Sequence, residues 1–265
     1  MTSAESKTSR AFTVPELLAV VAVCAILLAM LMPALTQARK HAMTVACASN
    51  LRQLTMSWRT FAADTRGKFV ESWQSNGGLT TGVGTHWYIV IERYYSRDKN
   101  LLLCPSARTR LTAPGTGGNY ATSGHAWKVG SPSVHRGITT EDYGSYGLNN
   151  WLEEPTVVGT GTGGARPNDW FIDRLSAASG HSDVPVLGDG CWPDQGWPLA
   201  SDLMPTSTID PMSTPTAGYM KRFALDRHME SINLSYLDCS TRTVKIKNLW
   251  SHKWHKGFVT KAEIP

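Results

Sequence analysis

The stretch RAFTVPELLAVVAVCAILLAMLMPALTQARKHAM, residues Arg10–Met43, decides how the rest of this chain is interpreted. From Phe12 to Leu35 its only charged side chain is Glu16, and the run exceeds the roughly 20 residues that a helix needs to cross the hydrocarbon core of a membrane. A cleaved secretory signal has a shorter apolar core that is followed by a small-residue cleavage site. We therefore interpret the run as a transmembrane helix.

The charges around this run predict its orientation and raise a question. Lys7 and Arg10 precede the run, and positive residues before a span hold the N-terminus in the cytoplasm, so we expect the rest of the chain outside. Glu16 is the exception in the run, because a carboxylate at membrane depth costs about 3 kcal/mol unless it is paired. It is interpreted either as a functional group or as a charge at the level of the lipid headgroups.

The segment AFTVPELLAVVAVCAILLAMLMPAL resembles the N-terminus of a type IV pilin or a type II secretion pseudopilin. In that family a prepilin peptidase cuts before a Phe, a Glu stands fifth in the mature chain, and a Pro often stands twenty-second. Counting Phe12 as the first residue, Glu16 is fifth and Pro33 is twenty-second. This chain departs from the family pattern at Ala11, where Gly is usual, and at Pro15, where Leu or Ile is usual.

The resemblance implies processing and assembly. It implies cleavage between Ala11 and Phe12, methylation of the new N-terminus, and pairing of Glu16 with the free amine of a neighbouring subunit in a filament. The partners would be the prepilin peptidase, other pilin or pseudopilin subunits and the bacterial inner membrane. The N-terminus would lie in the cytoplasm and the C-terminal head in the periplasm.

Composition argues against other classes of function. The chain has 265 residues and a net charge of +5 with scattered basic residues, so no nucleic-acid partner is expected. No G-x-S-x-G or H-E-x-x-H motif is present, so we expect no enzyme. Ten Trp, 23 Gly and 14 Pro describe an aromatic-rich domain with long loops, which need tight packing or cross-links.

The helix continues beyond the membrane segment. Apolar residues at spacings of four, three, four and three form one stripe of an amphipathic helix, and Gly67 follows as a stop signal. The stripe consists of Cys47, Leu51, Leu54, Trp58 and Phe61.

Later segments predict β-structure. DVPVLGDG is interpreted as a buried strand, and SINLSYLDCSTRTVKIKN alternates in the manner of a hairpin, with a turn at Asp238–Arg242. We therefore predict an α+β fold, with a long N-terminal helix packed on a small, loop-rich antiparallel β-sheet head, as in pilins. The predicted parts are a leader (1–11), a transmembrane or filament-core helix (12–35), an amphipathic helix (36–66) and a periplasmic head (67–265) with a loop-rich insert at about 106–215.

Four cysteines outside the membrane segment suit two disulfides in an oxidising compartment, and no C-x-x-C pair indicates a zinc ribbon. Cys47 faces the head from the helix stripe, so we predict a bond to Cys104, with two free buried thiols as the alternative. A second bond, Cys191–Cys239, is predicted because both residues follow strands that end in Asp.

The C-terminal region carries a further resemblance. CASNLRQLTMSWRTFAAD, LLCPS, SYGLNNW and DRHMESINLSYLDC are similar to a bacterial pseudopilin-like group whose members carry a His, nine residues and then Asp-Gly near the C-terminus. His228 and Asp238 keep this spacing, but Cys239 replaces the Gly.

Metal sites receive weaker support from the sequence. His228 with Asp226, Asp238 and Asp189 is one candidate group, although side chains beside a hairpin more often satisfy backbone donors. His252 and His255 are interpreted as packing residues between two Trp. No cofactor is expected, with Ca²⁺ as the alternative because major pseudopilins have a loop calcium site and Gly-rich loops here carry carboxylates. Its candidate ligands are Asp189, Asp194 and Asp202.

The favoured interpretation is a pseudopilin-like subunit of a bacterial type II secretion or type IV pilus-like system. The alternative is a membrane-tethered periplasmic binding or hydrolytic domain that uses a pilin-type anchor. A DNA-uptake pilin is a third interpretation, which the basic C-terminal segment keeps open. An uncut bond between Ala11 and Phe12 in a monomeric protein would favour the tethered domain.

Overall fold

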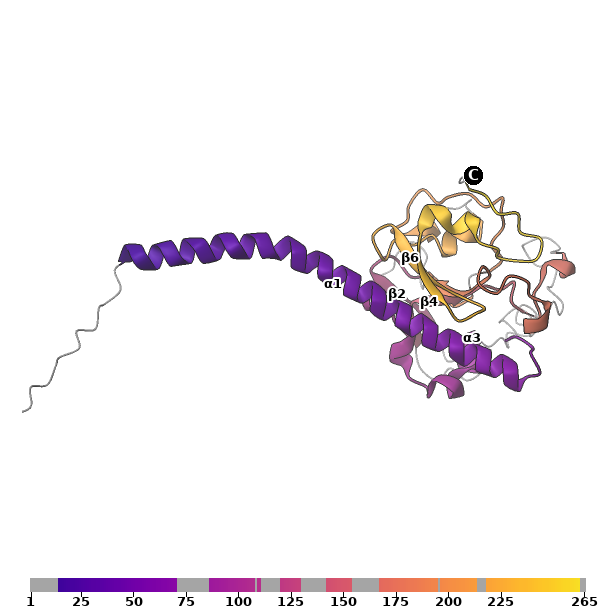
Figure 1. Ribbon diagram of the computed structural model, residues 1–265. Coiled ribbons are helices and arrows are strands. Elements are labelled where there is room, and N and C mark those ends of the chain that lie inside the picture. The colour runs from indigo at the N-terminus through magenta and orange to yellow at the C-terminus, as the bar shows by residue number, and fades with distance from the viewer. Residues whose placement is uncertain are drawn as a thin grey trace, which may run out of the picture. The chain divides into compact units, whose positions relative to one another are not determined.

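The computed structural model describes residues 14–70, 86–107, 109–110, 120–129, 142–153, 167–194, 196–213 and 218–262. The chain divides into two units, Met1–Ala42 and Met43–Pro265, and helix α1 (Val14–Asp64) contributes to both (Figure 1). The predicted α+β fold, with a long apolar N-terminal helix and a small antiparallel sheet region, is confirmed.

The first unit contains the part of α1 that is long and apolar enough to cross a membrane. Its large apolar side chains are exposed in the structure, with exposed fractions between 53% at Val20 and 76% at Val14. Pro33 lies inside the helix, where it lacks a backbone N–H. A solvent-facing surface of this kind is unfavourable in water and favourable in hydrocarbon. Ala11 and Phe12, the predicted processing residues, lie outside the described residues.

The described residues of the second unit form two β-sheets. The four-stranded sheet has the order β4-β5-β6-β7, with every neighbouring pair antiparallel. In the three-stranded sheet, of order β1-β2-β3, β1 and β2 are parallel and β2 and β3 are antiparallel. The strands are β1 (Thr109–Arg110), β2 (His125–Val129), β3 (Asp142–Gly144), β4 (Tyr146–Leu148), β5 (Pro185–Asp189), β6 (Ser231–Tyr236) and β7 (Thr241–Lys245).

Short helical turns precede, connect and follow these strands. The segment HWYIVIERYY contains α3 and η1. The described short helices are α3 (Trp87–Val90), η1 (Glu92–Tyr95), η2 (Lys99–Leu102), η3 (Pro105–Ala107), η4 (Asn168–Trp170), η5 (Leu175–Ala177), η6 (Pro211–Ser213), η7 (Met220–Arg222) and η8 (Ile246–Ser251).

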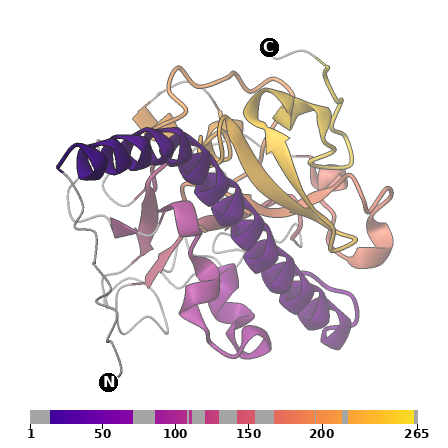
Figure 2. The ribbon, with the colours of Figure 1, turned by 60° about the vertical axis from the view of Figure 1, so that its left-hand side comes forward.

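The second half of α1 packs on the four-stranded sheet beside the β6–β7 hairpin (Figure 2). Cys47, Leu51, Leu54 and Trp58, four of the five stripe residues, are fully buried in the core. Polar contacts join the same surfaces, since the Thr55 and Ser235 hydroxyls lie 2.6 Å apart. The stripe predicted from the sequence therefore marks the face of α1 that is buried in the head.

The predicted hairpin is confirmed, and both faces of its first strand are buried. All six residues of β6 are buried, although only alternate residues are apolar. Asn233 and Ser235 face α1, whereas Ile232, Leu234 and Tyr236 belong to a second apolar cluster on the other face. That cluster contains four buried tryptophans, Trp151, Trp197, Trp250 and Trp254. β6 thus lies between α1 on one face of the sheet and the second apolar cluster on the other face.

The turn between β6 and β7 holds Cys239 in the left-handed region, with φ at 64°. The backbone N–H of Cys239 donates to the carbonyl of Tyr236 (2.8 Å), and the side chain of Asp238 accepts from the N–H of Ser240 (2.9 Å). A residue with a Cβ is strained in this region, whereas glycine is not. This conformation gives a physical reason for the Gly that the pseudopilin-like group described in the sequence analysis carries after the Asp.

We predict that Cys239→Gly stabilises the head. Removing the Cβ relieves the left-handed strain, and we expect a gain of about 0.5–1 kcal/mol in the free energy of unfolding. Urea unfolding of the purified full chain in detergent measures it. Cys239→Ala is the matched control, because it removes the thiol and keeps the Cβ; equal gains for the two variants would contradict the explanation.

His255 is buried among aromatic side chains, in agreement with its interpretation as a packing residue. Its ring stacks on Trp170 at a centroid distance of 4.4 Å and also contacts Trp151 and Phe258. Burial away from water lowers the pKa of His255 from 6.5 to about 4. The imidazole therefore contributes to packing as a neutral ring.

This pKa shift predicts a loss of stability in weak acid. Between pH 6.5 and about 4 the unfolded state binds a proton at His255 that the folded state does not, so stability falls as the pH falls. Compared with His255→Phe, which keeps an aromatic ring and cannot titrate, the wild type should lose about 1–3 kcal/mol more between pH 7 and about pH 4.5. Urea unfolding at both pH values measures the difference, and parallel losses would refute the assignment.

Candidate functional site

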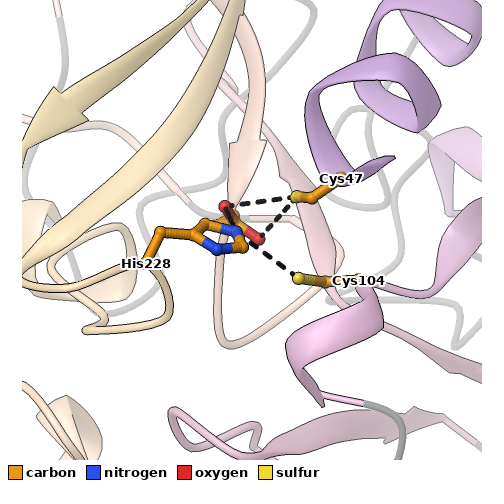
Figure 3. Close-up of side chains that lie close together, drawn as sticks. Cys47, Cys104 and His228 are labelled. Carbon is orange, nitrogen blue, oxygen red and sulfur yellow. Dashed lines mark hydrogen bonds and ion pairs between the residues drawn. The ribbon is translucent and has the colours of Figure 1, made fainter. Parts of the chain in front are cut away.

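Four chemically reactive side chains from distant parts of the sequence meet inside the second unit. They are Cys47, Cys104, Asp189 and His228, all are buried, and their ligand atoms all lie within 4.8 Å of one another. Cys47 projects from α1, Cys104 from the segment between η2 and η3, and His228 from the loop before β6 (Figure 3). Asp189 is the last residue of β5. We refer to these four residues as the Cys-Asp-His cluster.

Local structure explains how each residue reaches the cluster. Cys47 lies on the buried stripe of α1. The segment with Cys104 is held against the same helix, because the side-chain amide of Asn50 donates to the carbonyl of Leu103 (3.1 Å). His228 precedes a tight turn that returns the chain into β6, and its N–H donates to the carbonyl of Ser231 (3.0 Å).

The contacts within the cluster are close and mutual. The Cys47 sulfur lies 3.5 Å and 3.6 Å from the two carboxylate oxygens of Asp189. Nε2 of His228 lies 3.2 Å from Oδ2 of Asp189 and 3.5 Å from the Cys104 sulfur. Asp189 thus contacts Cys47, and His228 contacts both Asp189 and Cys104.

A second ring of polar groups orients the cluster. The phenol of Tyr146 donates to the Cys47 sulfur (3.4 Å), and the N–H of Asn233 donates to Oδ2 of Asp189 (2.9 Å). Nδ1 of His228 lies 3.2 Å from the hydroxyl of Thr44, so Nε2 is the nitrogen that faces the cluster. Each of these three cluster residues therefore has a partner outside the cluster that sets its orientation.

Two groups that can carry a positive charge face the carboxylate of Asp189. The buried guanidinium of Arg227 lies 3.3 Å from Oδ1 of Asp189. Burial alone would raise the pKa of Asp189, but the charges of His228 and Arg227 outweigh burial and lower it to about 2. Burial would likewise lower the pKa of His228, and the carboxylate of Asp189 raises it to about 10. The fold therefore holds an ionised carboxylate in its interior.

The two thiols differ in acidity. Burial, together with the neighbouring Cys104 and Asp189, raises the pKa of Cys47. Burial also acts to raise the pKa of Cys104, but hydrogen bonds from Cys47 and His228 and the charge of Arg227 lower it overall. Thiolate, imidazole and carboxylate are the ligand types that bind transition metals, and the cluster offers all three.

The structure brings the first predicted cysteine pair together without a bond. Cys47 and Cys104 are both free thiols, although their sulfurs lie within 4.8 Å of one another. The Cys47 sulfur faces Asp189 and the Cys104 sulfur faces His228, so each thiol has a polar partner besides the other thiol.

The second predicted pair, Cys191–Cys239, is corrected by the sheet register. β5 and β6 are antiparallel, with Pro185 opposite Tyr236 and Gly188 opposite Leu234. Cys191 therefore lies beyond one end of this strand pair and Cys239 beyond the other, roughly 20 Å apart at about 3.3 Å per residue. A disulfide requires Cα atoms within about 7 Å. Both residues are free thiols in the structure.

The three expected calcium ligands are not gathered in one loop, which corrects that expectation. Asp189 belongs to the cluster, and Asp194 forms an ion pair with His86. Asp202 caps backbone instead, because one of its oxygens accepts the N–H groups of Leu199, Tyr219 and Met220. Among the described residues, no group of potential metal ligands includes Asp194 or Asp202.

The two residues of the C-terminal motif lie at opposite ends of β6. His228 precedes the strand and joins the cluster, whereas Asp238 follows it and caps the turn. Asp226 accepts the N–H of Glu230 (2.7 Å), so of the three carboxylates considered for His228 the structure places only Asp189 beside it.

Comparison with known proteins adds no assignment. No family model, no curated protein and no solved structure matches this chain. The functional interpretation therefore rests on the sequence and on the geometry described above.

We predict that the charge of Asp189 is essential for the stability of the head. Asp189→Asn keeps the shape of the side chain and removes the partner of two buried cationic groups, so we expect a loss of about 3–5 kcal/mol. Asp238→Asn is the matched control, because the amide oxygen can still accept from Ser240 at an exposed turn, and it should change stability by less than about 1 kcal/mol. Thermal unfolding of both variants in detergent checks this, and equal midpoints would contradict it.

Proposed function

We propose that this chain is a pseudopilin-like subunit of a bacterial type II secretion or type IV pilus-like system. In this proposal a prepilin peptidase cleaves the chain before Phe12, and the mature subunit assembles through its N-terminal helix. The observation that carries the proposal is the position of Glu16 in the first turn of a helix whose following side chains are apolar and exposed.

The dimensions of the helix support a place in the membrane. From Val14 to Leu35 an α-helix rises about 33 Å, which matches a hydrocarbon core of about 30 Å. The large apolar side chains of this part of α1 are exposed, so lipid or neighbouring helices would have to cover them. Single-pass insertion in the inner membrane, with the head in the periplasm, follows the positive residues Lys7 and Arg10.

Glu16 supplies the assembly chemistry in this proposal. A carboxylate held in hydrocarbon is stabilised by an opposite charge, and cleavage before Phe12 creates a free amine at a similar depth. The carboxylate of one subunit can pair with the amine of its neighbour, which sets the axial register between adjacent helices. Pairing of this kind has no use in an isolated membrane anchor.

The second half of α1 also supports assembly through the N-terminal helix. It belongs to the core of the head through its buried stripe and through the hydrogen bond from Arg59 to the carbonyl of Leu237 (2.8 Å). A subunit that is drawn out of the membrane by its helix would therefore bring the head with it. The head would then supply the contacts along the filament or with its cargo.

We predict that Glu16→Val abolishes assembly and leaves membrane insertion intact. The substitution lowers the cost of insertion and removes one partner of a buried ion pair, a loss on the order of 3–5 kcal/mol per contact. The measurement is chemical cross-linking of heads in native membranes, together with the mass of the N-terminal peptide. Wild type should give a ladder of oligomers and a methylated Phe12.

The control is Leu17→Val, an apolar change at the neighbouring position, which should keep the ladder. Equal ladders for wild type and Glu16→Val would defeat the assembly mechanism. An intact N-terminus in a monomeric wild-type protein would favour the membrane-tethered binding or hydrolytic domain instead.

A further inference from the structure

We propose that Cys47, Cys104, Asp189 and His228 bind one transition metal ion of the Zn²⁺ class, which ties α1 to the sheet of the head. This inference goes beyond the proposed function and does not depend on it. It rests on the chemistry of the four side chains, on their geometry, on their charge and on the groups that orient them.

The donor set selects the class of metal. Two sulfurs, one imidazole nitrogen and one carboxylate oxygen converge in the cluster. Zn²⁺ takes this mixture of sulfur, nitrogen and oxygen ligands, whereas Ca²⁺ and Mg²⁺ prefer oxygen ligands alone. The same donors also bind other divalent transition metals, with affinities that follow their general order. The donor set therefore indicates a transition metal, and Zn²⁺ is the one most often used in structural sites of this kind.

The spacing of the donors matches a tetrahedral site. With bonds of about 2.0–2.3 Å, the ligand atoms of a tetrahedral zinc ion lie about 3.3–3.8 Å from one another. With Oδ2 as the carboxylate ligand, the cluster has Cys47 Sγ to Asp189 Oδ2 at 3.6 Å, His228 Nε2 to Asp189 Oδ2 at 3.2 Å and Cys104 Sγ to His228 Nε2 at 3.5 Å, and all four ligand atoms lie within 4.8 Å of one another. The site therefore requires little rearrangement to close around an ion.

The charges of the site sum to zero when a divalent ion is included. Two thiolates and one carboxylate contribute three negative charges, the ion contributes two positive charges, and the guanidinium of Arg227 beside Asp189 contributes the last positive charge. A buried group of charges is tolerated in a protein interior when it is neutral as a whole and hydrogen-bonded. Arg227 thus has a defined role as the counter-charge of the site.

Outer groups present the ligands in the required form. The hydroxyls of Thr44 and Ser106 lie 3.2 Å and 3.5 Å from Nδ1 of His228, where they can accept its N–H and leave Nε2 for the metal. Metal-bound histidines are held in this manner by a partner on the other nitrogen. Tyr146 donates to the Cys47 sulfur, and the Asn233 N–H donates to Asp189.

The burial of the site indicates a structural role. All four ligands belong to the protein and none is exposed, so there is no open position for a water or a substrate, as a catalytic site requires. The ion would link four segments that are distant in sequence: the helix stripe, the segment before η3, the end of β5 and the loop before β6. This is the cross-linking role that a Cys47–Cys104 disulfide would fill, so the disulfide is the rival occupant of the same two thiols.

The test begins with the wild-type full chain, purified in detergent without chelators or a polyhistidine tag. Elemental analysis should find about one zinc ion per chain, and a thiol-reactive mercurial should release it into a chromophoric chelator. After removal of the metal under reducing conditions, added Co²⁺ should give the visible bands of a tetrahedral site and a thiolate-to-cobalt charge-transfer band. These readouts need no variant, so a folding defect cannot hide the answer.

Matched cysteine variants then locate the site. Cys104→Ser should weaken Co²⁺ binding by at least about tenfold and reduce the charge-transfer band. Cys191→Ser is the control, because Cys191 is also buried but its thiol donates to the carbonyl of Arg222 (3.2 Å) outside the cluster, and it should bind Co²⁺ like the wild type. His228→Gln should also weaken binding and leave both thiolates in place.

Two results would overturn the proposal. One is a native protein without bound metal in which peptide mapping finds the Cys47–Cys104 disulfide. The other is a reduced protein that binds Co²⁺ without thiolate charge transfer, or equally well after Cys104→Ser. Both leave the Glu16 cross-linking experiment unaffected, so failure of the metal site and failure of the proposed assembly are distinguishable.

Discussion

The head depends on the burial of one face of α1 against the four-stranded sheet. The helix stripe from Cys47 to Trp58 removes large apolar side chains from water, and each fully buried side chain of this size contributes about 1.5–3 kcal/mol. The opposing face of β6 is polar, yet it is satisfied, because the side-chain amide of Asn233 donates to the carbonyl of Thr44 (2.9 Å). These contacts therefore fix the rotation of α1 about its own axis, and in this orientation Cys47 points to the end of β5.

At the end of β5, next to Cys47, a carboxylate lies in the interior of the head. Asp189 is fully buried, and it is stabilised by Arg227, by His228 and by the backbone of Asn233. These partners hold together the end of β5, the start of β6 and the adjoining loops. The guanidinium of Arg227 also donates to the carbonyls of Ser145 and Gly190, so one residue links the carboxylate to the junction of the two sheets.

Tryptophans order the loop-rich parts of the head on the other face of the sheet. The indole N–H of Trp151 donates to the carbonyl of Pro198 (2.8 Å), and that of Trp250 donates to the carbonyl of Asp202 (2.9 Å). Each ring buries a large apolar surface and uses its one donor to hold a loop. The high content of Trp, Gly and Pro thus has a single explanation, in which aromatic anchors order chain segments that have little regular structure.

Much of this architecture was predictable from the sequence because it depends on neighbours along the chain. The apolar run after Glu16, the stripe on α1 and the β6–β7 hairpin each repeat with the period of a helix or a strand, so local patterns were sufficient. The site was not predictable in this way. From the sequence alone, Cys47 and Cys104 were predicted to form a disulfide, with two free buried thiols as the alternative. His228 was grouped with Asp189 only as one of three candidate carboxylates, and the cysteines were not connected with either residue, because no short spacing links the four. Only the tertiary structure decided that the four meet, since packing of α1 on the sheet and the crossing of chain segments bring them together. It also decided that Cys191 and Cys239 lie apart, because antiparallel pairing of β5 and β6 sends the two residues to opposite ends of the sheet.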